Sequence, residues 1–290
     1  MTGKTDLHIH TNISDGRFSP QEIVKKATQL GLGTIAICDH DSIDSIPLTH
    51  AAAVNYPQLK VIPGVEISTY APGSEVHILG YFIDFKNLKL ENALKDSRNS
   101  RIERAREMIT RLNKLNISIS WQQVRKVAGS STVGRPHLAQ VMLDKGYIKS
   151  FKEAFEKYIG LGGPAYIERY KITPSEAVSL IKEANGLPVL AHPLTINQPE
   201  KLIASLKAIG LAGVEVHYNG YNQDERKTLA LLADQFNLIT TGGSDYHGID
   251  DHTETMLGDA SVPRECAERL IALAGQPEQQ SIKLKSMEDL

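Results

Sequence analysis

The sequence predicts an α/β barrel that carries an inserted all-helical subdomain. Short apolar segments typical of buried strands alternate with amphipathic helical segments in the first and last parts of the 290-residue chain. From about 99 to 159, helical patterns follow one another without intervening strands. No low-complexity or linker-like segment separates these parts. We therefore expect the helical subdomain at 99–159 to pack against a barrel formed by 1–98 and 160–290.

The first expected strand and helix lie near the N-terminus. The segment 5–10 has the apolar character of a short strand. Ser19 and Glu22 have the spacing of a capping box, with Pro20 at the first helical position. Gly31 marks the end of this helix, because glycine commonly follows the last helical residue.

Three apolar segments follow this helix and precede the insert. The segment 34–40 is almost continuously apolar, which is typical of a strand buried on both faces of a parallel sheet. The segments 60–68 and 75–83 are the next expected strands. The first part of the chain is thus expected to supply four strands to the barrel.

The last part of the chain repeats the alternation. Thr173 and Glu176 form a second capping-box pattern, which opens a helix that runs to 185–186. The remaining expected strands are 187–193, 212–218 and 238–247, and the remaining expected helices are 199–209 and 223–236.

The composition excludes several classes of protein. With 41% hydrophobic and 23% charged residues, the chain resembles an ordinary globular protein. A formal net charge of −2 gives no sign of a surface that coats nucleic acid. Cys38 and Cys266 are too few for a disulfide framework or a thiolate zinc site. No apolar run approaches the roughly 18–20 residues of a membrane span, so we expect a cytoplasmic protein without membrane contact.

Histidines and carboxylates gather at the expected strand ends. His8 and His10 are two residues apart in a strand and project to the same side, and Asp245 and His247 repeat this spacing. In a parallel barrel the carboxyl ends of the strands share one face, where active sites lie. His77 joins that face if its side chain points inward. The residues expected to converge there are His8, His10, Asp15, His40, Glu66, His77, His192, Asp245 and His247.

This set of side chains predicts a metal centre. Imidazole and carboxylate without cysteine suit borderline-to-hard divalent ions. Nine donors exceed what one ion can use, so two or three ions are expected. Paired ions can share a hydroxide and bind the oxygens of a phosphoryl group, which would attract an anionic substrate without a basic surface.

Five motifs carry a resemblance to a known family. DLHIHTNISDG, CDHD, GVEIS, AHP and GGSDYHG resemble the successive motifs of the PHP (polymerase and histidinol phosphatase) superfamily. The resemblance implies a distorted, TIM-like (β/α)7 barrel with a trinuclear metal centre that hydrolyses phosphate esters. It also implies that the ions are divalent, with Mn²⁺ expected and Fe²⁺ or Zn²⁺ as alternatives.

The resemblance implies one ligand set for each ion. Glu66 would bridge two ions, and Glu66 and Asp245 would hold the metal-bound hydroxide that attacks phosphorus. The first set is His8, His10, Glu66 and Asp245, the second is Glu66, His77 and His192, and the third is Asp15, His40 and His247.

The insert narrows the expected substrate. Gly134-Arg135-Pro136-His137 opens a helix and resembles a PHP subgroup of bacterial nucleotide phosphoesterases. That subgroup converts 3′,5′-bisphosphonucleotides such as pAp to AMP and phosphate, or acts as a 5′→3′ exoribonuclease on short RNA. The resemblance implies that Arg135 and His137 bind substrate phosphate. Arginine offers a forked donor, and the helix N-terminus adds favourable dipole charge.

Two other functions stay open. The first is histidinol-phosphate phosphatase, against which the helical insert argues. The second is a non-catalytic accessory PHP module that uses metals for folding. The complete ligand set and the lack of an accompanying polymerase region favour an enzyme, and no obligate protein partner is evident.

Several side chains also have a plain structural interpretation. Asp15 can be a turn residue and Asp41 a helix cap. The basic run at 101–111 is most simply a solvated helix face, although it could guide an RNA chain. Glu215 and His217 share a face of their expected strand but are left out of the predicted site. His50 and His252 are expected to be solvated, and Cys38 to be a small buried hydrophobe.

Overall fold

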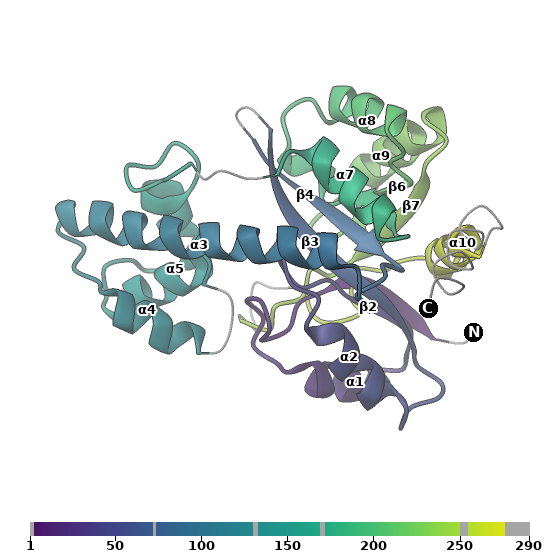
Figure 1. Ribbon diagram of the computed structural model, residues 1–290, viewed down its shortest axis with the longest axis horizontal. Helices are drawn as coiled ribbons and strands as arrows, with labels where there is room; N and C mark the ends of the chain where they lie inside the picture. Colours follow the sequence, from purple (N-terminus) through teal and green to yellow (C-terminus); the bar gives the residue numbers. More distant parts are fainter. Residues whose placement is uncertain (1–2, 72–73, 130–132, 169–171, 250–254, 276–290) are drawn as a thin grey trace.

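Seven strands form one sheet that curves into a nearly closed barrel (Figure 1). The computed structural model describes residues 3–71, 74–129, 133–168, 172–249 and 255–275. The strands are hydrogen-bonded in chain order, which confirms the predicted fold class. They are β1 (Lys4–Ile9), β2 (Leu32–Ile37), β3 (Lys60–Ala71), β4 (Ser74–Tyr81), β5 (Leu187–Leu190), β6 (Gly213–Tyr218) and β7 (Ile239–Gly243).

Helices surround the barrel and form the insert (Figure 1). Both predicted capping boxes, Ser19 with Glu22 and Thr173 with Glu176, are present. No helix in the described ranges combines the length and apolar character needed to cross a bilayer. The α-helices are α1 (Pro20–Gln29), α2 (Ser45–Ala53), α3 (Leu88–Lys114), α4 (Trp121–Ala128), α5 (Arg135–Asp144), α6 (Phe151–Ala154), α7 (Pro174–Glu183), α8 (Pro199–Ala208), α9 (Gln223–Gln235) and α10 (Arg264–Ala274), with a π-helical turn at Phe155–Ile159 and a 3₁₀ turn at Pro193–Thr195.

One strand, β4, departs from the parallel arrangement of the others. This strand runs antiparallel to both β3 and β5, whereas the other neighbouring strands are parallel. Ala71 pairs with Ser74, and a connection of two residues can join only antiparallel strands. Because β4 is reversed, His77 in the middle of this strand pairs with Ser68 towards the end of β3. This reversal brings His77 to the rim formed by the carboxyl ends of the parallel strands.

The first and last strands meet and close the barrel. The Asp245 amide donates to the His8 carbonyl at 2.9 Å, and the His10 amide donates to the Tyr246 carbonyl at 2.9 Å. Gly243 permits this approach, since a Cβ at that position would lie 2.4 Å from the His8 nitrogen. Closure therefore places the first and last histidine motifs side by side.

Three strands end three or more residues before their predicted ends. β7 ends at Gly243 rather than at 247, β5 at Leu190 rather than at 193, and β2 at Ile37 rather than at 40. The backbone φ angle is 53° at Asp245 and 26° at His192, and a positive φ is incompatible with extended strand geometry. Both side chains therefore project from loops at the rim.

The long helix α3 links two hydrophobic clusters and extends from the barrel into the insert (Figure 1). Its Leu90 and Leu94 belong to a cluster formed with barrel strands and flanking helices, whereas Met108 and Leu112 belong to the cluster of the insert. The insert cluster continues as far as Ile167. The predicted boundary at 99 falls inside this helix, and the division of the chain into two parts stays a prediction.

A further part of the barrel core is formed by side chains from several strands and from α10. Leu7, Ile62, Leu79, Val189 and Leu270 belong to this cluster and are almost completely inaccessible. The helix α10 lies at the end of the barrel away from the insert (Figure 1). Neither α2 nor α10 was expected. The polar rim therefore lies between this packed core and the insert.

Candidate metal centre

All nine predicted ligands lie at one rim of the barrel. His8, Glu66 and His77 project from strands, while most of the others follow a strand end. Glu66 is at the centre of the group, with both of its oxygens inside it. The ligands are His8 and His10 on and just after β1, Asp15 before α1, His40 after β2, Glu66 on β3, His77 on β4, His192 after β5, and Asp245 and His247 after β7.

The first ligand group surrounds the two histidines of the opening motif. Glu66 Oε2 lies 3.4 Å from His8 Nε2 and 3.3 Å from His10 Nε2. Asp245 Oδ1 lies 3.4 Å and 2.9 Å from the same two nitrogens. Two imidazole nitrogens and two carboxylate oxygens thus face one another, which corresponds to the first predicted ligand set.

The second group lies around the other oxygen of Glu66. Glu66 Oε1 is 2.8 Å from His77 Nδ1 and 3.2 Å from His192 Nε2. His40 Nδ1 is 3.0 Å from Glu66 Oε2, the oxygen of the first group, and one potential ligand atom from each of His40, Glu66 and His77 lies within 4.8 Å of the others. One carboxylate serving two groups through different oxygens has the arrangement of a bridging ligand.

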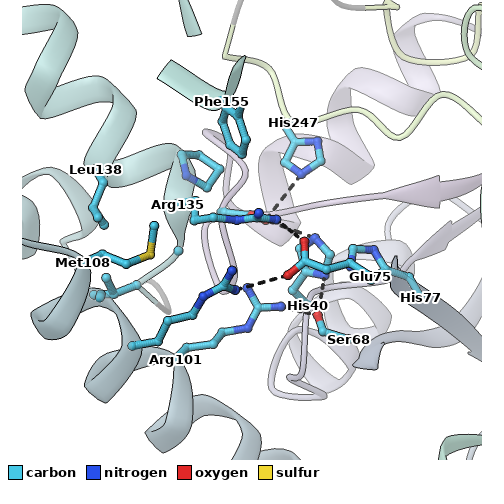
Figure 2. Close-up of a pocket in the computed structure, with 16 residues that line it drawn as sticks. His40, Ser68, Glu75, His77, Arg101, Met108, Arg135, Leu138, Phe155 and His247 are labelled. Carbon is cyan, nitrogen blue, oxygen red and sulfur yellow. Dashed lines mark hydrogen bonds and ion pairs between the residues drawn. The ribbon is translucent and has the colours of Figure 1, made fainter. Parts of the chain in front are cut away.

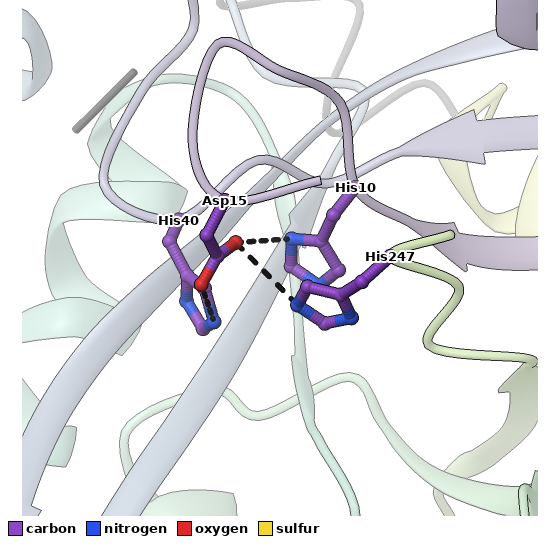
Figure 3. Close-up of side chains that lie close together, drawn as sticks. All are labelled: His10, Asp15, His40 and His247. Carbon is purple, nitrogen blue, oxygen red and sulfur yellow. Dashed lines mark ion pairs between the residues drawn. The ribbon is translucent and has the colours of Figure 1, made fainter. Parts of the chain in front are cut away.

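The third group is centred on Asp15 (Figure 3). Its carboxylate oxygens lie 3.4 Å from His247 Nε2, 3.8 Å from His10 Nδ1 and 3.9 Å from His40 Nε2. One potential ligand atom from each of these four residues lies within 4.8 Å of the others. Asp15 lies in a turn and also offers ligand atoms to this group.

Several buried polar atoms of these groups have no hydrogen-bond partner in the described part of the chain. They are His8 Nε2, both ring nitrogens of His10, Asp15 Oδ1 and Glu66 Oε2. Buried polar atoms are normally satisfied, so a convergent set of unsatisfied nitrogen and oxygen donors fits divalent cations well. The site is thus able to bind metal ions.

The site holds its carboxylates in the charged form. Burial by itself would raise the pKa of Glu66, but the imidazoles of His40 and His77 outweigh burial and hold it well below its ordinary value. The imidazoles of His40 and His247 likewise lower the pKa of Asp15 against the effect of burial. Burial dominates at His40 and lowers the pKa of its imidazole to about 3. Charged carboxylates and a neutral His40 are the forms that bind metals.

Glu215 supports this site, although it was left out of the predicted set. Its completely buried carboxylate lies 3.1 Å from His8 Nδ1 and accepts the His192 amide at 2.8 Å. A carboxylate on the far nitrogen of a metal-binding imidazole fixes the orientation of the ring. A charged residue inside the apolar strand GVEVHY was the available signal. Tyr218, whose hydroxyl donates to Asp245 Oδ2 at 2.8 Å, was missed altogether.

Two further buried aspartates hold the loops that carry ligands. Asp39 accepts hydrogen bonds at 2.7 Å from the Thr11 amide, the Thr11 hydroxyl and the Ser14 hydroxyl, which precede Asp15. Asp6 accepts from the amide and hydroxyl of Ser244, at 2.9 Å and 2.6 Å. Sequence reasoning missed both, because their partners are set by barrel closure and loop geometry.

A pocket separates the metal rim from the insert (Figure 2). Arg135 of α5 points towards Glu75, and Phe155 lies beside it. The polar side chains that line the pocket are Asp15, His40, Ser68, Glu75, His77, Arg101, Arg104, Arg135 and His247.

Part of the basic run of α3 is buried, although its simplest interpretation was a solvated helix face. Arg101 and Arg104 are only 15% and 9% exposed and face this pocket, whereas Arg106 and Arg111 are exposed as expected. Arg101 Nε donates to Asp41 Oδ2 at 2.7 Å. Asp41 is therefore the buried partner of an arginine and caps no helix, because the N-cap position of α2 is three residues further on.

The other histidines lie outside the ligand groups. His137 accepts the Gly134 amide at its Nδ1, at 3.0 Å, and thereby caps α5, so only its Nε2 is left for a substrate. His217 lies two residues after Glu215 on β6, and the pairing of β6 with β7 shifts its register between these two residues. His50, expected to be solvated, is partly buried with its ring against Phe85. His252 lies outside the described residues.

Comparison with known proteins points to phosphoester chemistry. The chain is 35% identical to a 5′-3′ exoribonuclease of Haemophilus influenzae over 251 residues, which cover 85% of this chain and 91% of that protein. It is 32% identical to a 3′,5′-nucleoside bisphosphate phosphatase of Chromobacterium violaceum, over 83% of this chain and 86% of that protein.

A solved structure shares the fold. It comes from Bifidobacterium adolescentis, is described as a candidate metal-dependent phosphoesterase, and superposes with a TM-score of 0.84 at 27% identity, covering 94% of this chain and 96% of that one. The model of the PHP domain matches residues 6–171. With more than half of its length matched and with relatives of this similarity, this chain belongs to the PHP domain family.

Proposed function

We propose that this chain is a metal-dependent phosphoesterase that hydrolyses nucleotide phosphate esters. Its substrates would be 3′,5′-bisphosphonucleotides such as pAp, converted to AMP and phosphate, or the 5′ ends of short RNA. The observation that carries the proposal is the convergence of nine imidazoles and carboxylates at one rim of the barrel, beside a pocket lined by arginines.

The three ligand groups would hold two or three divalent ions, with Mn²⁺ first among the candidates. Bound there, the ions would supply Lewis-acid activation of water and would neutralise charge on the phosphoryl group. Glu66 supports this role because its two oxygens serve different groups of histidines. Asp245 supports it because its Oδ1 faces His8 and His10 while Tyr218 holds its Oδ2.

The residues around the ligands would orient the substrate. Arg135 projects from the insert into the pocket and would donate to phosphate oxygens. Glu215 fixes the ring of His8, and Asp39 fixes the loop of Asp15, so the donors are held in place before any substrate arrives. Side chains of α3 and α5 line the pocket beside the rim and would restrict access of water to the reacting phosphate.

The test is a comparison of substrates in the presence of Mn²⁺. Phosphate release would be measured with pAp, a short 5′-phosphorylated RNA and histidinol phosphate, for the wild type and for Asp245→Ala. We expect turnover of the nucleotide substrates, and its loss in Asp245→Ala and after chelation. The exposed Asp234→Ala of α9 is the matched control and should keep full activity.

Each alternative gives a different result in this experiment. Fastest turnover of histidinol phosphate would favour a histidinol-phosphate phosphatase. Tight metal binding without hydrolysis of any phosphoester would favour an accessory module. Activity that survives both Asp245→Ala and chelation would refute the assigned site.

A further inference from the structure

At the end of the pocket where α3 and α5 meet β4, two arginines share one carboxylate. Glu75 on β4 accepts a hydrogen bond from Arg104 Nη1 at 3.2 Å and a second, short one from Arg135 Nη2 (Figure 2 shows Arg135 and Glu75). Arg104 comes from α3 and Arg135 from α5, so the barrel and the insert meet at Glu75. Two positive charges and one negative charge leave this end of the pocket with an excess of positive charge.

Arg101 does not contribute to this excess. Its Nε donates to Asp41, and its Nη2 donates to Ser68 on β3. Burial would lower the pKa of Arg101, but Asp41 and Asp15 outweigh burial and keep it charged and paired. Arg101 therefore belongs to the wall of the pocket, while Arg104 and Arg135 are the cations that a ligand would meet.

Arg104 retains an unused pair of donors. The side chain is 9% exposed, and its Nε and Nη2 are buried without a hydrogen-bond partner in the described chain. These two nitrogens form the side-on edge of the guanidinium group, which binds two oxygens of one anion at the same time. Burial of such an edge without an acceptor is unfavourable, so the arrangement points to a ligand.

The place of Arg104 in the fold supports this reading. Its guanidinium group lies over the ring of Tyr166, 5.1 Å from the centroid, and that of Arg135 lies over Phe155 at 5.2 Å. The aromatic rings fix the planes of the two guanidinium groups. His40 and His77, which belong to the metal rim, line the same pocket.

We propose that Arg104 and Arg135 form a second anion subsite, which binds a phosphate group that is not cleaved. This inference rests on the proposed function, because it assumes that the metal rim holds the phosphate that is cleaved. The substrate would then carry two phosphate groups, as a nucleoside bisphosphate or a 5′-phosphorylated RNA does. Glu75 is a positioning residue that keeps the two guanidinium groups apart and aligned.

The test uses two substrates that differ only in the second phosphate. Values of kcat/KM would be measured for adenosine 3′,5′-bisphosphate and for adenosine 3′-monophosphate, with wild type, Arg104→Gln and Arg104→Lys. We expect the ratio of the two values to fall about 10- to 100-fold in both variants, because lysine retains the charge but not the fork. The exposed Arg106→Lys of the same helix is the matched control and should keep the wild-type ratio.

An unchanged ratio in both Arg104 variants would mean that the substitutions affect the two substrates equally. This result would overturn the subsite and leave Arg104 as a structural link between barrel and insert. Arg104→Lys keeps a cation beside Glu75, so it serves as the folded variant if Arg104→Gln unfolds.

Failure of the proposed function has a separate signature. If the wild type cleaves neither substrate, calorimetric binding of adenosine 3′,5′-bisphosphate to the metal-free protein tests the subsite alone. We expect weaker binding to Arg104→Gln than to the wild type or to Arg106→Lys. Equal binding by all three proteins would contradict the inference.

Discussion

Glu66 is the residue that the first two ligand groups share. Its carboxylate is 1% exposed and lies within 3.4 Å of nitrogens from five histidines, His8, His10, His40, His77 and His192. A buried anion is stable only where cations or strong donors surround it. In this site the surrounding groups are imidazoles, and their nitrogens can also bind a metal ion together with Glu66.

The substitution Glu66→Gln should abolish the bridge between ligand groups. We expect kcat to fall at least about 100-fold, equivalent to ~3 kcal/mol of transition-state stabilisation, and bound Mn²⁺ to decrease. Phosphate release and elemental analysis of the purified protein would measure the two effects. Glu91→Gln, at an exposed position of α3, is the control. Full metal content together with full activity in Glu66→Gln would refute the bridging role.

Glu215 should act on metal affinity through His8. Because its carboxylate orients the ring without belonging to a ligand group, we expect Glu215→Gln to weaken metal binding about 10- to 100-fold. Excess Mn²⁺ should then restore activity, whereas it should not restore Glu66→Gln. A titration of activity against Mn²⁺ separates the two cases. The exposed Glu200→Gln of α8 should titrate like the wild type.

At the scale of elements, the contact between β1 and β7 assembles the site. Gly243 has no side chain, and a Cβ there would lie 2.4 Å from both the nitrogen and the Cβ of His8. That contact is too close for any real Cβ, so one of the two strands would have to move. A movement of β1 would displace the first histidines of the metal centre.

We therefore expect Gly243→Ala to destabilise the fold by about 1–3 kcal/mol and to weaken metal binding together with it. Urea unfolding and a metal titration would measure the two effects. Gly275→Ala, at the end of α10 where the nearest atoms lie 3.6 Å away, should be tolerated. Wild-type stability in Gly243→Ala would show that the barrel does not close as described.

The helix α3 connects the insert to the barrel, and Leu112 is one of its fully buried residues. We expect Leu112→Ala to cost about 2–5 kcal/mol within the insert cluster. Amide exchange should become faster in α4 and α5 while the barrel strands stay protected, because Leu112 does not belong to the barrel clusters. Leu115→Ala, at a position that is 40% exposed, is the matched control. Uniform loss of protection would instead mean that barrel and insert unfold as one unit.

At the scale of the whole molecule, bound metal should stabilise the closed barrel. Ligands from both ends of the chain meet at the rim, so a metal ion there can bind only the folded state with high affinity. At a thousandfold excess over Kd, a bound ion adds about 4 kcal/mol. We expect thermal unfolding in Mn²⁺ to occur at least several degrees above that in chelator. Asp245→Ala should lose most of this difference, and Asp234→Ala should keep it.

The sequence alone determined the fold class, the two capping boxes and the candidate ligands, because each depends on local spacing. A histidine pair in one strand, a capping box or a charged residue at a strand end can be recognised within a few residues. The same local reasoning could not assign Glu215, since a buried carboxylate shows its role only through a partner such as His8, 207 residues away.

Only the tertiary structure decided the direction of β4, the way the rim is completed and the inward orientation of Arg101 and Arg104. The reversal of β4 brings His77 to the rim, and barrel closure brings Asp245 beside His8 and His10. Because α3 packs into two clusters, Arg101 and Arg104 of its basic run line the pocket instead of facing solvent. These features depend on contacts between segments far apart in the chain, which no local pattern of residues records.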